Sequence, residues 1–338
     1  MKKYVAKRLG YVVVVFLVLS FLMFFLFNLI PGDPARAQLE GVRKTMKPDE
    51  YEVIYQNLRE SMGLNDPLVI RYMRWIGVAP EKAGGFDGLL QGNFGYSQFH
   101  KMDVVKVVVE PLKNTMFFNI FSIILTLAIT IPLGIYCAVH KNSRLDQAVQ
   151  GVTILGYSMP QYIIALIFIF FFAVVLRIFP VGGAKTPGSM YVGMKAFWDK
   201  LYYMALPILV STFSGLGDMS RYVRASMIDA LSLDCIRTAR AKGVRESAVV
   251  YSHAWRNALL PVVTSIIGWF LSVFSGSLIL ENVFGLNGMG QLYIQGLNNN
   301  DPELCLAIQM FYTIVALLGN LITDLVYGIV DPRIRVDK

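Results

Sequence analysis

Long apolar stretches that contain no charged residue dominate the pattern of the chain. They cover residues 9–32, 114–140, 147–176, 201–217, 257–280 and 304–323. A helix needs about 20 apolar residues to cross roughly 30 Å of hydrocarbon. Five stretches reach that length, and the fourth reaches it if its helix continues past Asp218. The pattern therefore predicts an all-α membrane protein with six transmembrane helices.

Polar residues divide the chain into three predicted parts. Residues 1–32 form an N-terminal span, residues 33–113 a mixed segment outside the membrane, and residues 114–338 a five-helix core. The turn Pro31-Gly32-Asp33-Pro34 ends the first span. Ala35-Arg36-Ala37 resembles a signal-peptide cleavage site, but the apolar stretch before it is about twice the usual length. We therefore expect an uncleaved first span.

Composition and charge agree with a membrane location. Of 338 residues 55% are apolar and only 16% are charged, whereas a soluble domain carries about 25% charged residues. With six spans both termini lie on one side, and that side carries 16 Lys and Arg against 8 Asp and Glu. The other side is balanced, so the net charge of +8 indicates both termini in the cytoplasm rather than nucleic-acid binding.

The third stretch contains Ser158-Met159-Pro160. Proline lacks a backbone donor and kinks a helix, and a membrane tolerates this where neighbouring helices or cavity water satisfy the freed carbonyl. Either bundle packing or a wall of a substrate path would explain the kink.

The polar loop 220–260 is too long for a simple hairpin and too short for a domain. Its centre, residues 233–243, is predicted to be a short helix. Ser232 or Asp234 would cap its N-terminus, and Gly243 would follow its C-terminus.

One side of this short helix is apolar and small. Ile236, Ala239 and Gly243 recur at helical spacing, and basic residues occupy the rest. Such a helix could lie on the membrane surface, connect two spans in solvent, or dock into a partner. Its apolar side is too small for strong lipid anchoring, which favours a partner.

No catalytic or metal-binding set is evident. The three histidines fall in separate segments: His100, His140 and His253. No phosphate-binding G-x-x-x-x-G-K-[ST] loop is present, so an ATP-driven process would need a nucleotide site on another chain.

Other chemistry-bearing residues are scattered. Cys137, Cys235 and Cys305 form no disulfide framework. Asp218 and Asp324 are candidates for a proton relay, but an interfacial carboxylate paired with Arg is the preferred interpretation.

Several motifs resemble a known family. The inner loop contains Arg237-Thr238-Ala239-Arg240-Ala241-Lys242-Gly243 and His253-Ala254-Trp255-Arg256-Asn257-Ala258-Leu259-Leu260-Pro261. This resembles the inner-loop signature of binding-protein-dependent ABC importer permeases, in particular the peptide/nickel/opine branch and its first permease subunit. Further motifs agree in order and spacing: Pro31-Gly32-Asp33-Pro34, Met62-Gly63-Leu64, Asp66-Pro67-Leu68, Gly92-Asn93-Phe94-Gly95-Tyr96-Ser97, Glu281, Phe284-Gly285-Leu286-Asn287-Gly288-Met289-Gly290 and Asp331-Pro332-Arg333-Ile334-Arg335.

The resemblance implies a type I importer fold and a non-catalytic subunit of a bacterial or archaeal cytoplasmic membrane. It implies three kinds of protein partner besides the lipid bilayer: a second homologous permease, two cytoplasmic ATPases that bind ATP and Mg, and an extracytoplasmic substrate-binding protein. This chain would bind no cofactor itself. The expected cargo is short peptides, with nickel, opines or oligosaccharides as alternatives within the family. A stand-alone secondary carrier is the less favoured interpretation.

The resemblance also assigns residues. The loop 220–260 would be the coupling loop, and its coupling helix would comprise Asp234, Cys235, Ile236, Arg237, Thr238, Ala239, Arg240, Ala241, Lys242 and Gly243. Small Ala239 and Ala241 would let the helix backbone approach the ATPase. The translocation path is expected to include Ser158, Met159, Pro160 and Phe274.

Overall fold

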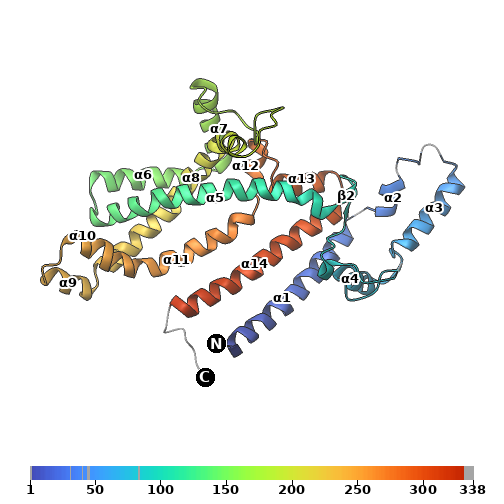
Figure 1. Ribbon diagram of the computed structural model, residues 1–338, viewed down its shortest axis with the longest axis horizontal. Coiled ribbons are helices and arrows are strands. Elements are labelled where there is room, and N and C mark those ends of the chain that lie inside the picture. The colour runs from blue at the N-terminus through green and yellow to red at the C-terminus, as the bar shows by residue number, and fades with distance from the viewer. Residues whose placement is uncertain (1, 31, 40, 44–45, 83, 331–338) are drawn as a thin grey trace. The chain divides into compact units, whose positions relative to one another are not determined.

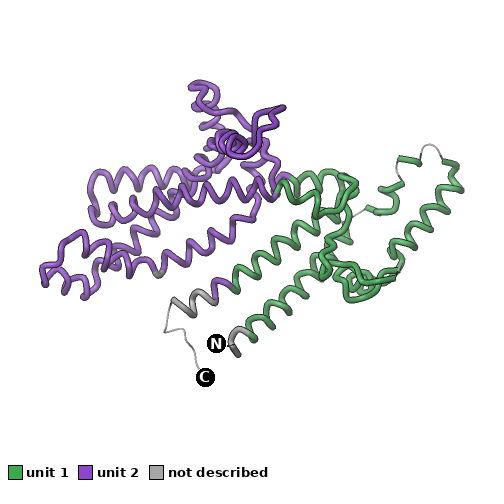
Figure 2. The backbone as a smooth tube through the Cα atoms, viewed as in Figure 1, with its two compact units in different colours: residues 1–111, 292–321 green, residues 112–291, 322–338 purple. Residues whose placement is uncertain are grey.

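A computed structural model describes residues 2–330 apart from residues 31, 40, 44, 45 and 83 (Figure 1). Pro31 of the first turn and the predicted C-terminal motif Asp331–Arg335 lie outside the described residues. The chain divides into two compact units, residues 1–111 with 292–321 and residues 112–291 with 322–338 (Figure 2). Each unit is described by itself below.

The first unit is helical apart from one short pair of antiparallel strands. Its elements are α1 (Lys2–Leu29), α2 (Pro34–Leu39), α3 (Pro48–Ser61), α4 (Leu68–Ile76), the 3₁₀ turn η1 (Leu89–Gln91), β1 (Tyr96–Ser97), β2 (Met102–Asp103), most of α13 (Met289–Asn298) and the first part of α14 (Pro302–Val330). The strands pair Tyr96 with Asp103 and Ser97 with Met102.

Packing in the first unit joins residues far apart in the chain. Phe24 of α1 and Met310 of α14 belong to one buried cluster, against which Tyr72 and Trp75 of α4 pack. The hydroxyls of Ser20 and Tyr72 lie 2.7 Å apart, which satisfies a buried polar group on α1. The segment after the first span is thus packed against the span itself.

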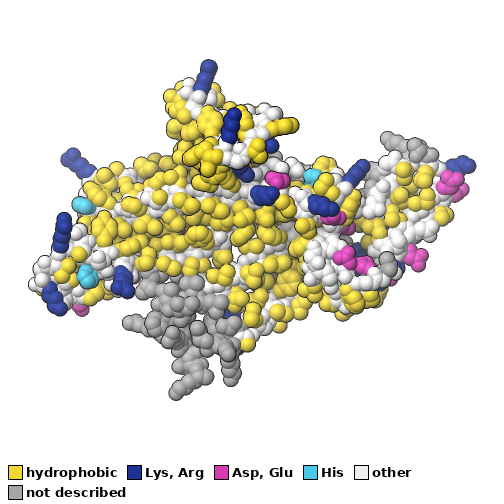
Figure 3. Space-filling model, viewed as in Figure 1, with side chains coloured by type: hydrophobic (Ala, Val, Ile, Leu, Met, Phe, Trp, Pro, Cys, Tyr) yellow, Lys and Arg dark blue, Asp and Glu magenta, His cyan; other side chains and the backbone are white. Residues whose placement is uncertain are grey.

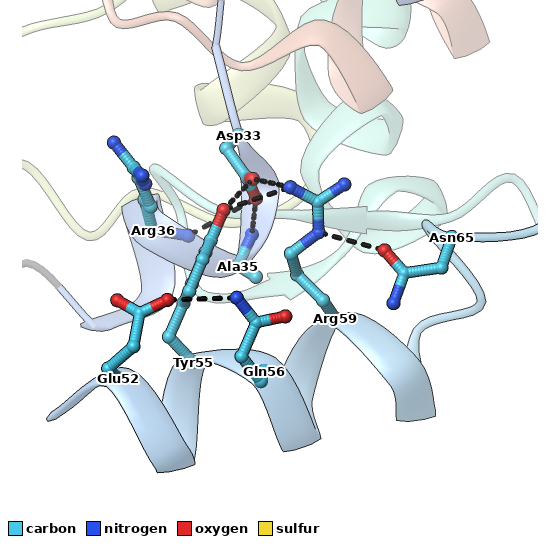
Figure 4. A network of polar contacts seen from close by, with 8 residues as sticks. All are labelled: Asp33, Ala35, Arg36, Glu52, Tyr55, Gln56, Arg59 and Asn65. Carbon is cyan, nitrogen blue, oxygen red and sulfur yellow. Dashed lines mark hydrogen bonds and ion pairs between the residues drawn. The ribbon is translucent and has the colours of Figure 1, made fainter. Parts of the chain in front are cut away.

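A polar network holds the start of that segment (Figure 4). Asp33 accepts a hydrogen bond from the Ala35 amide at 2.9 Å, which caps α2. The same carboxylate accepts from the Tyr55 hydroxyl at 2.5 Å and from Arg59 at 3.1 Å, both on α3. The Arg36 guanidinium lies 5.0 Å from the centre of the Tyr55 ring. One carboxylate therefore ties α2 to α3.

The second unit is a helical bundle built around the long helix α8. It contains α5 (Val104–Val139) from residue 112 onward, α6 (Arg144–Ser158), α7 (Gln161–Phe168), the π-helix η2 (Ile169–Val175), α8 (Met194–Leu231), α9 (Asp234–Ala241), α10 (Glu246–Ala248), the π-helix η3 (Val249–Ala254), α11 (Trp255–Leu271), the 3₁₀ turn η4 (Ser272–Phe274) and α12 (Leu278–Val283). Helix α8 packs against α6, α7 and α11.

Small residues let these helices approach closely. A Cβ atom added at Gly134 of α5 would lie 2.8 Å from Val223 of α8, and one at Gly217 of α8 would lie 2.6 Å from the Thr153 carbonyl of α6. Close backbone approach through small residues is typical of membrane helices, because lipid tails supply no hydrophobic drive for association.

A buried ion pair joins α6 to α8. Asp146 is 2% exposed and accepts two hydrogen bonds from Arg224, each 2.8 Å long. Asp146 also accepts from the Asn142 amide, and Ser143 caps α6. Because a charge buried without a partner is costly, this pair sets the position of the α5–α6 turn relative to α8.

Most described residues of the apolar stretches lie in helices. Among the described residues three helices are long and apolar enough to span a membrane unbroken: Ala6–Leu29, Val104–Val139 and Pro302–Asp324. Two bent pairs raise the number to as many as five. The predicted span 201–217 lies inside the 38-residue α8, which does not reach the same apolarity. Apolar side chains cover much of the face in view, as expected for helices in lipid (Figure 3).

Candidate functional site

The short helix in the inner loop is α9. It begins at Asp234 after the N-cap residue Leu233, whose backbone is extended. Among the residues that the structure describes, no side chain caps the N-terminus of α9. The expectation that Ser232 or Asp234 would cap it is therefore wrong. The Ser232 hydroxyl instead donates to the Asp229 carbonyl of α8. Ser232 is the C-cap residue of α8, so its hydroxyl bonds back to that helix and not forward to α9.

Gly243 ends this segment as predicted. Its φ is +74°, a backbone conformation that side chains disfavour, and a Cβ added there would meet nothing within 4 Å. The Gly243 amide donates to Arg240 and the Val244 amide to Ala239, the hydrogen bonds of a Schellman-type helix end. An ion pair of 2.7 Å between Arg240 and Glu246 spans the turn.

Two residues of α9 anchor it to the rest of this chain. Ile236 is fully buried and Ala239 is 8% exposed. Both belong to a cluster with Met227 of α8, Val249 of η3 and Ile135 of α5. The expectation that Ala239 would face an ATPase is therefore wrong, since the small apolar side is used for packing within the subunit.

The other eight residues of the predicted coupling segment are exposed. They are Asp234, Cys235, Arg237, Thr238, Arg240, Ala241, Lys242 and Gly243. This surface is basic, and Lys and Arg side chains gather at the end of the bundle that carries α9 and α10 (Figures 1 and 3). The structure thus separates an anchoring side of α9 from a side that is free to contact a partner.

A groove of about 410 Å³ lies beside this segment. Its lining comes from the end of α8, the N-cap of α9 and the first half of α11: Tyr222, Ala225, Ser226, Asp229, Ala230, Leu233, Asn257, Ala258 and Pro261. The Tyr222 hydroxyl donates to the Pro261 carbonyl at 3.3 Å, which links α8 and α11 across one side.

The predicted kink at Pro160 is a full break. Helix α6 ends at Ser158, Met159 is extended, Pro160 is the N-cap residue of α7, and the chain bends by 108° between the two helices. Ser158 and Pro160 are exposed, whereas Met159 packs against a buried cluster that includes Leu206 of α8. Proline removes a donor and the residue before it avoids the helical region, so both halves of the break follow from the sequence.

Phe274 lies elsewhere, at the end of η4. The Asn119 amide of α5 holds this turn by donating to the carbonyls of Ser272, Val273 and Ser275, with the two shortest distances at 2.9 Å. Asn119 was missed as a positioning residue because its partners are more than 150 residues away.

A buried carboxylate in the second unit was likewise not predicted to have a role. Glu281 is 1% exposed and accepts from the Thr115 hydroxyl at 2.7 Å and the Gln291 amide at 2.9 Å. Thr115 in turn accepts from the Met289 amide. A lone charged residue directly after an apolar stretch was the available signal. Within the described part of the chain, no three His, Cys, Asp or Glu side chains are placed to hold a metal ion.

A helical bundle with candidate membrane spans and a short exposed helix in a basic loop is the arrangement expected of a membrane protein that contacts a partner. The family described as "Binding-protein-dependent transport system inner membrane component" matches residues 130–336. Its N-terminal companion, "Binding-prot-dependent transport system membrane comp, N-term", matches residues 1–119. The chain belongs to this family of inner membrane components, and it is the multi-pass, non-catalytic permease subunit of an ABC importer.

Relatives match over the full length. The oligopeptide transport system permease protein AppB of Bacillus subtilis is 32% identical and covers 99% of this chain and 100% of its own. OppB of Haemophilus influenzae, named an oligopeptide transport system permease protein, is 31% identical over 99% and 100%. DppB of Bacillus subtilis, named a dipeptide transport system permease protein, is 29% identical over 100% and 99%.

One solved structure supports the fold. A chain of the inward-facing MetNI methionine ABC transporter superposes with a TM-score of 0.52 at 18% identity, covering 67% of this chain and 97% of its own. This likeness bears on the fold alone, and it agrees with the expected all-α importer permease.

Proposed function

We propose that this permease subunit imports short peptides. The observation that supports the cargo is full-length similarity to permeases named for oligopeptides and dipeptides, AppB at 32% and DppB at 29% identity. A relative at 30% identity, GsiC of Salmonella paratyphi A, is named a glutathione transport system permease protein, which makes a modified tripeptide the second candidate.

The complete transporter would contain four further chains. A second homologous permease would complete the path, two cytoplasmic ATPases would bind ATP and Mg, and an extracytoplasmic binding protein would deliver the peptide. Both termini would be cytoplasmic, because the segments on their side carry the excess of Lys and Arg. We keep the proposed division of the chain into an N-terminal span (1–32), an extracytoplasmic segment (33–113) and a five-helix core (114–338).

Within this assembly α9 would be the docking element for one ATPase. Its support is geometric: one side is anchored through Ile236 and Ala239, so movement of α9 is passed to α8, η3 and α5. Arg237, Thr238 and Ala241 are exposed on the other side. Gly243 lets the chain turn back directly toward α10, which keeps this surface clear. Nucleotide-driven movement of the ATPase would then rock the spans.

The translocation path would use the break at Ser158-Met159-Pro160 and the η4 turn at Phe274. The support is local, since irregular backbone at membrane depth is tolerated where it is buried in protein or lines a cavity. The first region is the break within one bent pair, Arg144–Ser158 with Gln161–Val175, and Phe274 ends the second helix of the other pair, Pro261–Phe274.

The docking surface is tested by adding a carboxylate to α9. Ala241→Glu is expected to lower co-purification of the ATPases from detergent-solubilised membranes about tenfold, as for loss of one central interface contact. Val53→Glu on α3 is the matched control, because Val53 is 61% exposed in the segment proposed to lie on the opposite side. Ala239→Glu should instead reduce the folded protein. Unchanged ATPase recovery with Ala241→Glu would contradict the docking proposal.

The cargo is tested by uptake. The purified transporter in proteoliposomes, with its binding protein and internal ATP, is expected to accumulate radiolabelled dialanine or tetra-alanine and to accept glutathione less well. Uptake of nickel or an oligosaccharide in place of all three peptides would overturn the peptide assignment while leaving the permease assignment intact.

A further inference from the structure

The first unit contains a cavity of about 470 Å³. It opens between the end of α1, helix α4, the loop that precedes β1 and the start of α14, all within residues 1–111 and 292–321. Its volume lies in the range of about 300–1,000 Å³ that is typical of small-ligand sites. Nothing in the coupling segment or the proposed translocation path lines it.

Most of the charged groups that line the cavity have internal partners. Asp33 is paired with Arg59, and Arg74 with Asp66. Asp301 accepts from the Ser97 hydroxyl and from the amides of Phe99 and Leu304. The Asp87 carboxylate accepts from the Asn93 amide. Asp33, Arg74 and Asp301 therefore have little capacity left for a ligand, and Asp87 is exposed to solvent.

Apart from the exposed Glu81, two charged lining groups remain incompletely paired. Arg71 of α4 makes one hydrogen bond, 2.5 Å to the Asn28 side-chain oxygen, and leaves most of its five donors unused. Glu303 of α14 accepts one bond, from the Tyr96 amide at 3.0 Å. Within the part of the chain that the structure describes, neither has an oppositely charged side chain within ion-pairing distance. Burial lowers the pKa of Arg71, as does its positive neighbour Arg59.

The two groups line the same cavity from different helices without pairing with each other. A buried or half-buried charge is stabilised by an opposite charge with hydrogen bonds. A ligand that carries one anionic and one cationic group would satisfy both. The chemistry of the cavity is therefore complementary to a zwitterion.

The position of the cavity distinguishes between zwitterions. Asn28 lies in the last turn of α1 and Glu303 in the first turn of α14, and both helices are candidate spans. Phe24, Phe27 and Leu306 of these helices form its apolar lining. The cavity thus lies where hydrocarbon meets headgroups, at the end of α1 opposite to its basic N-terminus.

We propose that this cavity binds a phospholipid whose headgroup carries a primary ammonium, with the phosphate on Arg71 and the ammonium on Glu303. The planar guanidinium matches two phosphate oxygens, and the carboxylate accepts from the ammonium. The apolar lining continues along α1 and α14 toward the acyl chains. The bound lipid would join α4 to α14 across the cavity, and this does not depend on what the transporter carries.

Lipid retention tests the proposal. The full-length subunit, purified with the chains that accompany it, is placed in nanodiscs of equal phosphatidylethanolamine and phosphatidylglycerol, and after detergent washing the retained lipids are counted by mass spectrometry. The wild type is expected to retain phosphatidylethanolamine above its bulk fraction. Arg71→Gln should lower retention of both lipids about tenfold, because the phosphate contact is common to them. Glu303→Gln should lower only phosphatidylethanolamine.

Controls keep loss of binding distinct from loss of folding. Arg43→Gln and Glu60→Gln make the same substitutions at exposed residues of the same unit that do not line the cavity, and they should match the wild type. Continued retention of phosphatidylglycerol by Glu303→Gln shows that this variant is folded.

Three results would overturn the proposal. The first is retention of phosphatidylethanolamine in its bulk proportion by the wild type. The second is wild-type lipid retention in both cavity variants. The third is binding of dialanine, added in solution, that both variants abolish while lipid retention stays constant, which would make the cavity a site for a soluble zwitterion.

Discussion

Two carboxylates, one in each unit, organise loops by different means. Asp33 lies at the start of the segment after the first span and is about one-fifth exposed. It accepts hydrogen bonds from the amides of α2 and from the Tyr55 hydroxyl, and Arg59 compensates its charge. Water and a cation thus both remain within reach of this group.

Glu281 has no such compensation. It is 1% exposed and bound by the Thr115 hydroxyl and the Gln291 amide, and among the described residues no cation lies within ion-pairing distance. Gly288 and Gly290 press against its carboxylate so closely that a Cβ at either would lie within 3.0 Å of it. This carboxylate joins α5, α12 and the start of α13 by neutral donors alone.

The comparison shows that pairing lowers the pKa of one acid, whereas burial raises the pKa of the other. Burial would raise the pKa of Asp33, but hydrogen bonds from Tyr55 and the α2 amides, together with Arg59, lower it below its usual value. Burial raises the pKa of Glu281, and hydrogen bonds from Thr115 and backbone amides offset only part of this effect.

The largest expected effect comes from removing the uncompensated acid. Glu281→Leu should lower the free energy of unfolding by about 4 kcal/mol, because Thr115 and the Gln291 amide lose their buried acceptor. Glu281→Gln, which keeps one acceptor, should cost about half as much. Thermal unfolding in detergent and hydrogen exchange of residues 286–291 measure both. Equal stability of the Leu variant and wild type would show that these hydrogen bonds contribute little.

Crowding around the same carboxylate should be the next largest effect. A Cβ at Gly288 would lie 2.3 Å from the Glu281 carboxyl carbon, so Gly288→Ala is expected to cost about 3 kcal/mol. Gly268→Ala in α11 is the control, since nothing lies within 4 Å of its added Cβ. The double variant Gly288→Ala/Glu281→Ala should be less unstable than the sum of the single variants. Strict additivity in the unfolding measurements would show that the two positions do not compete for space.

The compensated acid should matter less. Asp33→Ala removes the α2 cap and the partner of Arg59, which predicts a loss of about 2 kcal/mol in the first unit. Asp49→Ala, in the exposed first turn of α3, is the matched control. Limited proteolysis after residues 36 and 59 reports on this unit. If cleavage of the two variants proceeds equally fast, the network in Figure 4 is not a stabilising one.

The smallest effect, of about 1 kcal/mol, is the pH dependence that separates the two acids. The Glu281 contribution is fully present below the usual pKa of 4.5 and is lost as pH rises through the raised folded value. The Asp33 contribution is present above the usual pKa of 3.8 and is lost as pH falls through the lowered folded value. Unfolding of Glu281→Gln and Asp33→Asn between pH 3 and pH 8 should remove these slopes separately. If stability depends on pH with the same slope in both variants, the two acids do not have opposite pH dependences.

Local structure could be predicted well from the chain. The first, second and sixth apolar stretches lie in α1, α5 and α14, because apolarity over about 20 residues is itself the requirement for a span. Pro160 predicted an interruption between α6 and α7, and Gly243 the end of the α9 segment. Each of these features depends on neighbours within one or two turns.

Prediction of the candidate site was less complete. Helix α9 begins at Asp234 as expected and ends at Ala241, two residues before the predicted end of the coupling segment, and its small apolar side was recognised. What this side packs against was not predicted correctly. By size and spacing, Ala239 would fit a partner's groove or this chain's core equally well. Ala239 faces the core because η3 and α8 supply the apolar side chains that surround it.

The sequence by itself determined which segments are helices, where they stop, and that the chain enters a membrane. Hydrophobic length, proline and glycine act locally, and their consequences are readable one stretch at a time. Only the tertiary structure decided which charges meet. Asp146 faces Arg224, Glu281 faces Thr115, and Arg71 and Glu303 line one cavity without pairing. The physical reason is that a buried charged group is stabilised by partners that lie tens to hundreds of residues away in the chain. No local sequence pattern encodes these partners.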